Sequence, residues 1–122
     1  MTLGEFLQRE AASRAPWNCS TMAADWCMAL GHPDFAKRWR RITTGPAIRK
    51  ATRRGLVRLW LQGIGPALPV VADLRMGDIA VIEAGGEEAG AIFTGQRWAM
   101  RRERGLLFVA PEGIPILKVW RP

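Results

Sequence analysis

The sequence predicts an α+β domain, with a helical half over residues 1–65 and a β-rich half over residues 69–122. In the first half, apolar residues recur at a spacing of three and four, which is the period of one helix face. The second half changes to short apolar or alternating runs bounded by glycine, proline or charge, as in antiparallel strands. At 122 residues and 48% apolar composition, the chain suits one core and is too short for two ordinary domains. We therefore expect a single domain over residues 1–122, with helices packed on a small antiparallel sheet.

The first helix is predicted over residues 3–13. Thr2 and Glu5 form a capping-box pattern, in which each side chain can bond the backbone N–H of the other residue. Leu3, Phe6 and Leu7 fall on one side of this helix and should face the core.

The second predicted helix runs from Asn18 to about residue 30 and carries a cysteine on its first turn. Asn18 can cap the start, and Gly31 with Pro33 can end the helix. A cysteine at the positive end of a helix is favoured as a thiolate, so Cys19 is a candidate nucleophile. The simpler interpretation is a small buried apolar residue. Asp25, on the same helix, is expected to pair with an arginine.

Three further helical segments are predicted, over residues 34–41, 46–54 and 56–62. They carry most of the charge excess: the chain has 18 Lys and Arg against 11 Asp and Glu, and residues 35–72 hold nine cations and no acidic residue. Such a face would attract phosphate, a polyanion or an acidic protein, although it can also be a solvated surface. The residues predicted to bind are Arg38, Trp39, Arg41, Arg49, Arg53 and Arg54. Trp39 is the best candidate for surface contact because it stands among the cations.

Five strands are predicted in the second half, over residues 79–82, 89–93, 96–100, 106–109 and 116–120, with hairpin turns at 85–86 and 95–96. No metal site is expected, because one histidine and two distant cysteines cannot make a tetrahedral set. No cofactor is expected either, since the chain lacks a glycine-rich phosphate loop. The sequence has neither an apolar run of membrane-spanning length nor the pattern of a secretion signal, which predicts synthesis in the cytoplasm.

A cysteine at a helix start, followed some 50 to 60 residues later by a Gly-Asp strand and a hairpin, resembles the layout of the NlpC-type, papain-like cell-wall cysteine peptidases. The chain also resembles a group of small phage and prophage domains over nearly its whole length. The motifs that carry this resemblance are Asn18-Cys19, Ala23-Ala24-Asp25-Trp26, Gly31-His32-Pro33-Asp34, Gly77-Asp78, Gly105-Leu106-Leu107-Phe108-Val109-Ala110-Pro111 and Val119-Trp120-Arg121.

The chain departs from the peptidase pattern at the catalytic base. A cysteine hydrolase needs a base close to the thiol, and histidine is the usual one. Where the peptidases carry that histidine this chain has Glu88, or Ala89 if the hairpin shifts by one residue. The single histidine, His32, lies 13 positions after Cys19, beyond the far end of the same predicted helix. A carboxylate beside a thiolate disfavours the thiolate, so Glu88 is a poor substitute.

These observations leave three functional hypotheses. The resemblance implies a phage or prophage tail-associated structural or assembly protein with a peptidase-like fold and an incomplete catalytic triad. Such a protein would be made in the bacterial cytoplasm, enter a virion tail and bind tail or other assembly proteins. The second hypothesis is an active cysteine hydrolase, a peptidoglycan endopeptidase or amidase, that uses Cys19. The third is a basic nucleic-acid-binding protein, and peptidoglycan or another polyanion is a further candidate ligand of the basic face.

Overall fold

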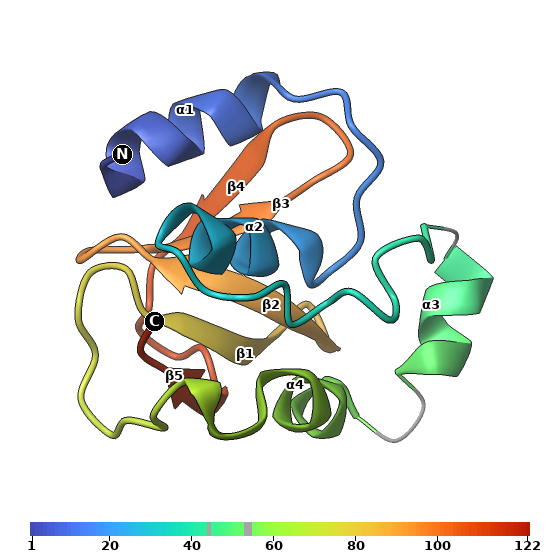
Figure 1. Cartoon of the computed structure of the whole chain (residues 1–122). Helices are drawn as coiled ribbons and strands as arrows, with labels where there is room; N and C mark the ends of the chain where they lie inside the picture. Colours follow the sequence, from blue (N-terminus) through green and yellow to red (C-terminus); the bar gives the residue numbers. More distant parts are fainter. Residues whose placement is uncertain (44, 53–54) are drawn as a thin grey trace.

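A five-stranded antiparallel sheet forms the C-terminal half of the chain, and helices of the N-terminal half pack on one of its faces (Figure 1). The structure is a computed structural model that describes residues 1–43, 45–52 and 55–122. The strands are β1 (Ile79–Ala84), β2 (Glu87–Phe93), β3 (Trp98–Arg101), β4 (Leu106–Val109) and β5 (Ile116–Trp120). Their order in the sheet is β4-β3-β2-β1-β5, and every neighbouring pair is antiparallel. The predicted α+β class is confirmed.

Four of the predicted helices are present and begin within three residues of their predicted starts, whereas the predicted end of the helix over residues 46–54 lies outside the described residues. These helices are α1 (Leu3–Ala12), α2 (Thr21–Ala29), α3 (Gly45–Ala51) and α4 (Leu56–Ile64), and a short 3₁₀ turn, η1 (Gly65–Ala67), follows α4. The Thr2 half of the predicted capping box is confirmed, since the Thr2 hydroxyl accepts from the Glu5 N–H at 3.1 Å; the Glu5 carboxylate accepts from the Thr2 hydroxyl, also at 3.1 Å, where a full capping box has it accept from the Thr2 N–H. In Figure 1, α2 lies across the sheet and α3 stands apart from it.

Two apolar clusters lie on opposite faces of the sheet, because successive strand residues point to opposite sides. On one face, α1, α2 and α4 pack against the sheet around Trp60, whose ring centroid is 4.9 Å from Phe35 and 5.6 Å from Trp120. Loop residues, among them Val71 and Ile114, pack on the other face. The strand residues of this second cluster are Ala80, Ile82, Ala91, Phe93, Trp98 and Val119.

The predicted helix over residues 34–41 is wrong, because this segment forms consecutive tight turns. The Trp39 N–H bonds the Ala36 carbonyl at 3.0 Å, three residues back instead of four. The Asp34 carboxylate accepts from the Ala36 N–H at 3.0 Å and also binds Arg40, and these local bonds favour turns over a helix. The turns direct Trp39 into the core next to Gly63, where an added Cβ would lie 2.6 Å from its ring.

The predicted strands and hairpins are confirmed, with small shifts at their ends. Strand β2 begins two residues earlier than predicted, and β3 begins two residues later. Gly85 and Gly86, between β1 and β2, have φ angles of 61° and 80°, which glycine adopts without steric cost. This hairpin carries Glu87 and Glu88 at the start of β2.

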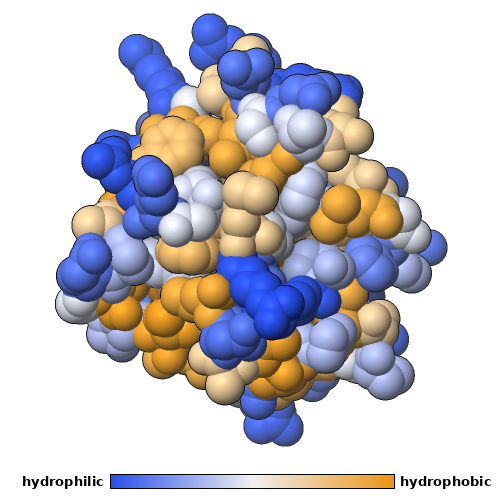
Figure 2. Space-filling model, turned by 90° about the vertical axis from the view of Figure 1, so that its left-hand side faces the viewer, coloured by the Kyte–Doolittle hydropathy of each residue, from blue (hydrophilic) through white to orange (hydrophobic). Residues whose placement is uncertain are grey.

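The face seen in Figure 2 has several apolar patches separated by hydrophilic side chains. Among the described residues, no helix is long and apolar enough to cross a bilayer. The two cysteines are free thiols.

Candidate functional site

Cys19 and Glu88 line one surface cavity of about 380 Å³. The lining residues come from the segment before α2, from α3, from the start of α4 and from the start of β2. They are Cys19, Ile48, Thr52, Leu56, Glu87 and Glu88. The structure therefore brings together the two residues that the sequence singled out as candidate nucleophile and substituted base.

Close packing of the cysteine segment on β2 creates this arrangement. An added Cβ at Gly90 would lie 2.3 Å from the Cys19 carbonyl oxygen and 2.6 Å from the Trp60 ring, so only glycine leaves room for the contact. Glu88 is two residues before Gly90 on the same strand, and residues two apart point to the same face of a sheet. The Glu88 side chain consequently lies on the face against which the cysteine segment packs.

A buried hydrogen-bond network holds the residues on either side of Cys19. The Asn18 side chain accepts from the Ser20 N–H at 2.9 Å and donates to the Trp39 carbonyl at 2.8 Å. The Ser20 hydroxyl accepts from Trp60 Nε1 at 2.8 Å. The prediction that the Asn18 side-chain oxygen accepts from a backbone N–H is confirmed, but the predicted helix start at Asn18 is wrong, because Ser20 is the residue at the N-cap of α2. Cys19 lies before α2 instead of on its first turn, which weakens the argument that the helix dipole activates the thiol.

The electrostatic environment keeps Cys19 protonated. Burial raises the pKa of its thiol and the Glu88 carboxylate raises it further, while a hydrogen bond with Ser20 and one with the Cys19 backbone act in the opposite direction. Only the thiolate is an effective nucleophile, so this environment opposes nucleophilic chemistry at neutral pH. Burial raises the pKa of the second cysteine, Cys27, to about 12, as expected of a core residue.

Glu88 belongs to a group of glutamates at the β1–β2 hairpin. Its Oε2 atom accepts a long bond of 3.4 Å from the Leu56 N–H. The residue directly opposite on β1 is Glu83, and like charges in such cross-strand positions destabilise a strand pair. Within the described residues, Glu83, Glu87 and Glu88 form no ion pair.

His32 lies away from this cavity. Its backbone N–H donates to the Cys27 carbonyl at 3.0 Å, just past the C-terminal end of α2. Its side chain lines a separate, small cavity with Cys27 and Phe35. His32 is the only histidine of the sequence, so the chain brings no imidazole to Cys19.

The predicted basic face is present only in part. Arg38 and Arg41 are exposed on the turns before α3. Trp39 is only 3% exposed, so its predicted surface contact is wrong: its ring packs beside Phe35, at a centroid distance of 6.4 Å. Arg53 and Arg54 lie outside the described residues, as does the side chain of Arg49.

Arg40 joins the turn segment to α2. Its Nη1 atom lies 2.8 Å from Asp25, and its Nε and Nη2 atoms bind the two oxygens of Asp34 at 2.8 and 2.9 Å. The prediction that Asp25 pairs with an arginine is confirmed. The residue after Asp25, Trp26, donates its indole N–H to the Gly77 carbonyl at 2.9 Å, which ties α2 to the turn before β1. These motif residues thus have structural roles.

The C-terminal motif has a structural role as well. The Arg121 guanidinium binds both oxygens of the buried Asp78 carboxylate, at 2.9 and 2.8 Å. This ion pair holds the residue after β5 to the turn that precedes β1. The Gly-Asp pair of the sequence therefore anchors the end of the sheet.

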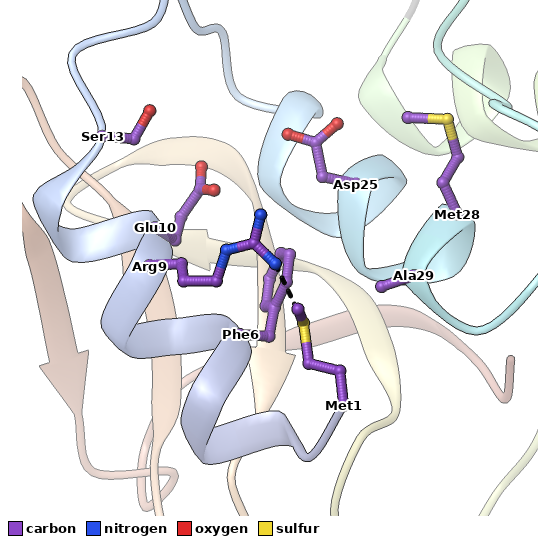
Figure 3. Close-up of a pocket in the computed structure, with 8 residues that line it drawn as sticks. All are labelled: Met1, Phe6, Arg9, Glu10, Ser13, Asp25, Met28 and Ala29. Carbon is purple, nitrogen blue, oxygen red and sulfur yellow. Dashed lines mark hydrogen bonds between the residues drawn. The ribbon is translucent and has the colours of Figure 1, made fainter.

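Sequence reasoning missed a groove of about 510 Å³ between α1 and α2 (Figure 3). Glu10 of α1 and Asp25 of α2 line it, and burial raises the pKa of both carboxyl groups. Glu10 is held by the buried Arg101 of β3, at 3.3 Å. The motif that contains Asp25 does not indicate this groove, because the other lining residues come from α1, its flanking Met1 and Ser13, and the end of α2, and their approach depends on the tertiary packing. Among the described residues, no group of three or more potential ligands could hold a metal ion.

One family model matches residues 2–121 of the chain, and it is described as a domain of unknown function, DUF6950. No curated protein and no solved structure matches the chain. The family match includes all the residues that line the Cys19 cavity. The chain therefore belongs to the DUF6950 family.

Proposed function

We propose that this protein is a non-catalytic binding module with a peptidase-like fold, and that it serves as a tail-associated structural or assembly component of a phage or prophage. The cavity that holds a nucleophile and its base in the peptidases would here serve for recognition. The resemblance of its motifs to small phage and prophage domains supports the phage assignment.

The observation that carries the proposal is the pairing of Cys19 with Glu88. A thiol hydrolase needs a base that lowers the thiol pKa and later returns the proton. Here burial and the neighbouring carboxylate both raise that pKa. The same cavity retains apolar walls and two carboxylates, which are groups that can hold a ligand without reacting with it.

A second candidate function, binding of a polyanion, is favoured by the exposed cations of residues 35–72, the stretch without acidic residues. The exposed cations among its described side chains are Lys37, Arg38, Arg41, Lys50 and Arg58. None of these five forms an ion pair with a described residue. Binding to unrelated DNA sequences that weakens steeply with salt would support this function.

Genetic complementation tests the main proposal. The gene is deleted from its genome, particle assembly is followed by electron microscopy and infectious titre, and the deletion is complemented with wild type or Cys19→Ser. The proposal predicts that the deletion causes tail defects. Wild type and Cys19→Ser should restore the tails equally, because the thiol has no catalytic role. Normal tails without the gene would contradict the assembly role. Failure of folded Cys19→Ser to complement would contradict the non-catalytic role.

A further inference from the structure

We propose that a further pocket, between the C-terminal end of α1 and the β3–β4 hairpin, binds the carboxylate group of a small acid or of a peptide C-terminus. This pocket, here named the Arg101 pocket, has a volume of about 320 Å³. Its lining includes residues 13–17, which link α1 to α2, together with Arg101 and Glu103 of the hairpin. The inference goes beyond the proposed function, because the Arg101 pocket shares no lining residue with the Cys19 cavity.

Arg101 lines the pocket, and its guanidinium has an unused donor. The side chain is only 4% exposed. Its Nη1 atom donates to the carbonyl and the carboxylate of Glu10, and its Nη2 atom donates to the Ser13 carbonyl at 2.9 Å. The Nε atom is buried as well and has no hydrogen-bond partner among the described residues. A buried N–H without an acceptor is rare and costly, so this group points to a ligand that supplies an oxygen.

The position of the unused donor suits a carboxylate. In a guanidinium, the Nε–H and one Nη2–H lie along one edge and match the two oxygens of a carboxylate. Arg40 and Arg121 use this edge in the present fold, where each holds both carboxylate oxygens of an aspartate through Nε and Nη2. In Arg101 the same edge lies at Ser13, a residue that lines the pocket. A carboxylate oxygen bound beside Ser13 would therefore reach the free Nε–H.

Arg14 supplies the charge that attracts an anion. It lines the pocket, it is exposed, and it forms no ion pair with a described residue. Arg101 shares its own charge with Glu10 at 3.3 Å. The attraction thus comes from Arg14, and the directed hydrogen bond comes from Arg101.

Glu103 is the lining group that opposes an anion. The residues on either side of it are Arg102 and Arg104, which are both exposed and form no ion pair within the described structure. These two cations offset the Glu103 charge at the hairpin. Next to the lining residues in sequence, the only position outside the described structure is Thr44, whose side chain carries no charge.

The remaining lining residues suit the apolar body of an acid. The Trp17 ring lies over the Arg101 guanidinium, with its centroid 5.9 Å from the Cζ atom, and Ala15 and Pro16 extend this apolar wall. Thr43 adds a hydroxyl group. Apolar walls with a few polar groups are typical of small-ligand sites, whose volumes are roughly 300 to 1,000 Å³.

The test titrates the ¹⁵N-labelled full chain with N-acetyl-Gly-Gly-Leu, with the same peptide ending in a carboxamide, and with isovalerate. Binding is followed by the side-chain Nε–H resonance of Arg101 and by the backbone amide resonances of residues 13–17. We expect a saturable downfield shift of the Nε–H resonance with the free acids, and an affinity roughly tenfold lower for the carboxamide. Tighter binding of the peptide acid would identify a peptide C-terminus as the source of the carboxylate, and tighter binding of isovalerate would identify a small acid.

Two variants at exposed arginines localise the effect. Arg14→Gln should weaken binding of the free acids roughly tenfold. Arg58→Gln removes an exposed cation from α4, which lies near β5 at the other end of the sheet from β4, and should leave binding unchanged (Figure 1). Equal affinity for acid and carboxamide, equal effects of the two variants, no saturable shift of the Arg101 Nε–H resonance, or tighter binding of inorganic phosphate than of either acid would overturn the inference.

Discussion

Replacing Gly90 by alanine tests the packing that brings Cys19 and Glu88 together. The new Cβ would lie 2.3 Å from the Cys19 carbonyl oxygen and 2.6 Å from the Trp60 ring, and real Cβ atoms essentially never approach other atoms closer than 3.0 Å. One of these neighbours is backbone and the other is a fully buried ring, so neither can move cheaply. Overpacking of this kind costs about 3 kcal/mol, at the upper end of the usual range.

The expected shift in melting temperature follows from the size of the chain. At about 2.1 cal/mol/K per residue, 122 residues give an unfolding entropy near 0.26 kcal/mol/K, so each kcal/mol lowers Tm by roughly 4 °C. Gly90→Ala should therefore lower Tm by about 12 °C, measured by circular dichroism and checked by urea unfolding. A loss of less than about 0.5 kcal/mol, typical of an ordinary surface site, would refute this packing.

Three further predictions use other contacts. Gly4→Ala adds a Cβ within α1 that would lie 3.9 Å from Thr2 Oγ1, an ordinary van der Waals contact, and the change should raise the free energy of unfolding by about 0.5 to 1 kcal/mol in urea unfolding; a loss of stability would contradict this. Asp34→Asn should cost about 2 kcal/mol at pH 7, because hydrogen bonds from Arg40 lower the pKa of Asp34. A carboxyl group whose pKa is lower in the folded than in the unfolded protein stabilises the fold above its unfolded pKa. The cost of Asp34→Asn should therefore shrink as the pH falls through the folded-state pKa of Asp34. A cost independent of pH would refute the ion pair. Glu88→His places an imidazole beside Cys19 and should raise its alkylation rate at pH 7 roughly tenfold, whereas an unchanged rate would mean that position 88 does not face the thiol.

The sequence predicted the sheet well because its signals are local. Each strand is a short apolar run between glycines, prolines or charges, and the hairpin at Gly85 and Gly86 needs two residues with positive φ. The start of α1 was predictable for the same reason, since Thr2 and Glu5 are close in sequence.

The turn segment before α3 was mispredicted because tertiary contacts determine its conformation. Arg40 binds Asp25 on a different element as well as the nearby Asp34, and Trp39 fills space beside Gly63. Neighbouring cations made Trp39 look like a surface residue, whereas its ring is buried. A helical pattern in sequence could not reveal these competing contacts.

The candidate site was predictable in its parts and not in its surroundings. The motif pattern singled out Cys19 and Glu88, and both line the same cavity. No sequence pattern indicated that Ile48 and Leu56 would line this cavity, because those residues reach it through the packing of α3 and α4. The hydrogen bonds of Asn18 were missed for the same reason, since one of them reaches the Trp39 carbonyl, 21 residues away.

The central claim is that Cys19 is a neutral, non-nucleophilic thiol beside Glu88. Its most direct test is the rate of Cys19 alkylation by iodoacetamide from pH 5 to 9, resolved from Cys27 by mass spectrometry, with Cys19→Ser as the control. The raised pKa predicts slow modification at pH 7 and a rate that still increases above the ordinary thiol pKa of about 8.5. Fast labelling that reaches a plateau below pH 7 would reveal an activated thiolate and contradict the claim.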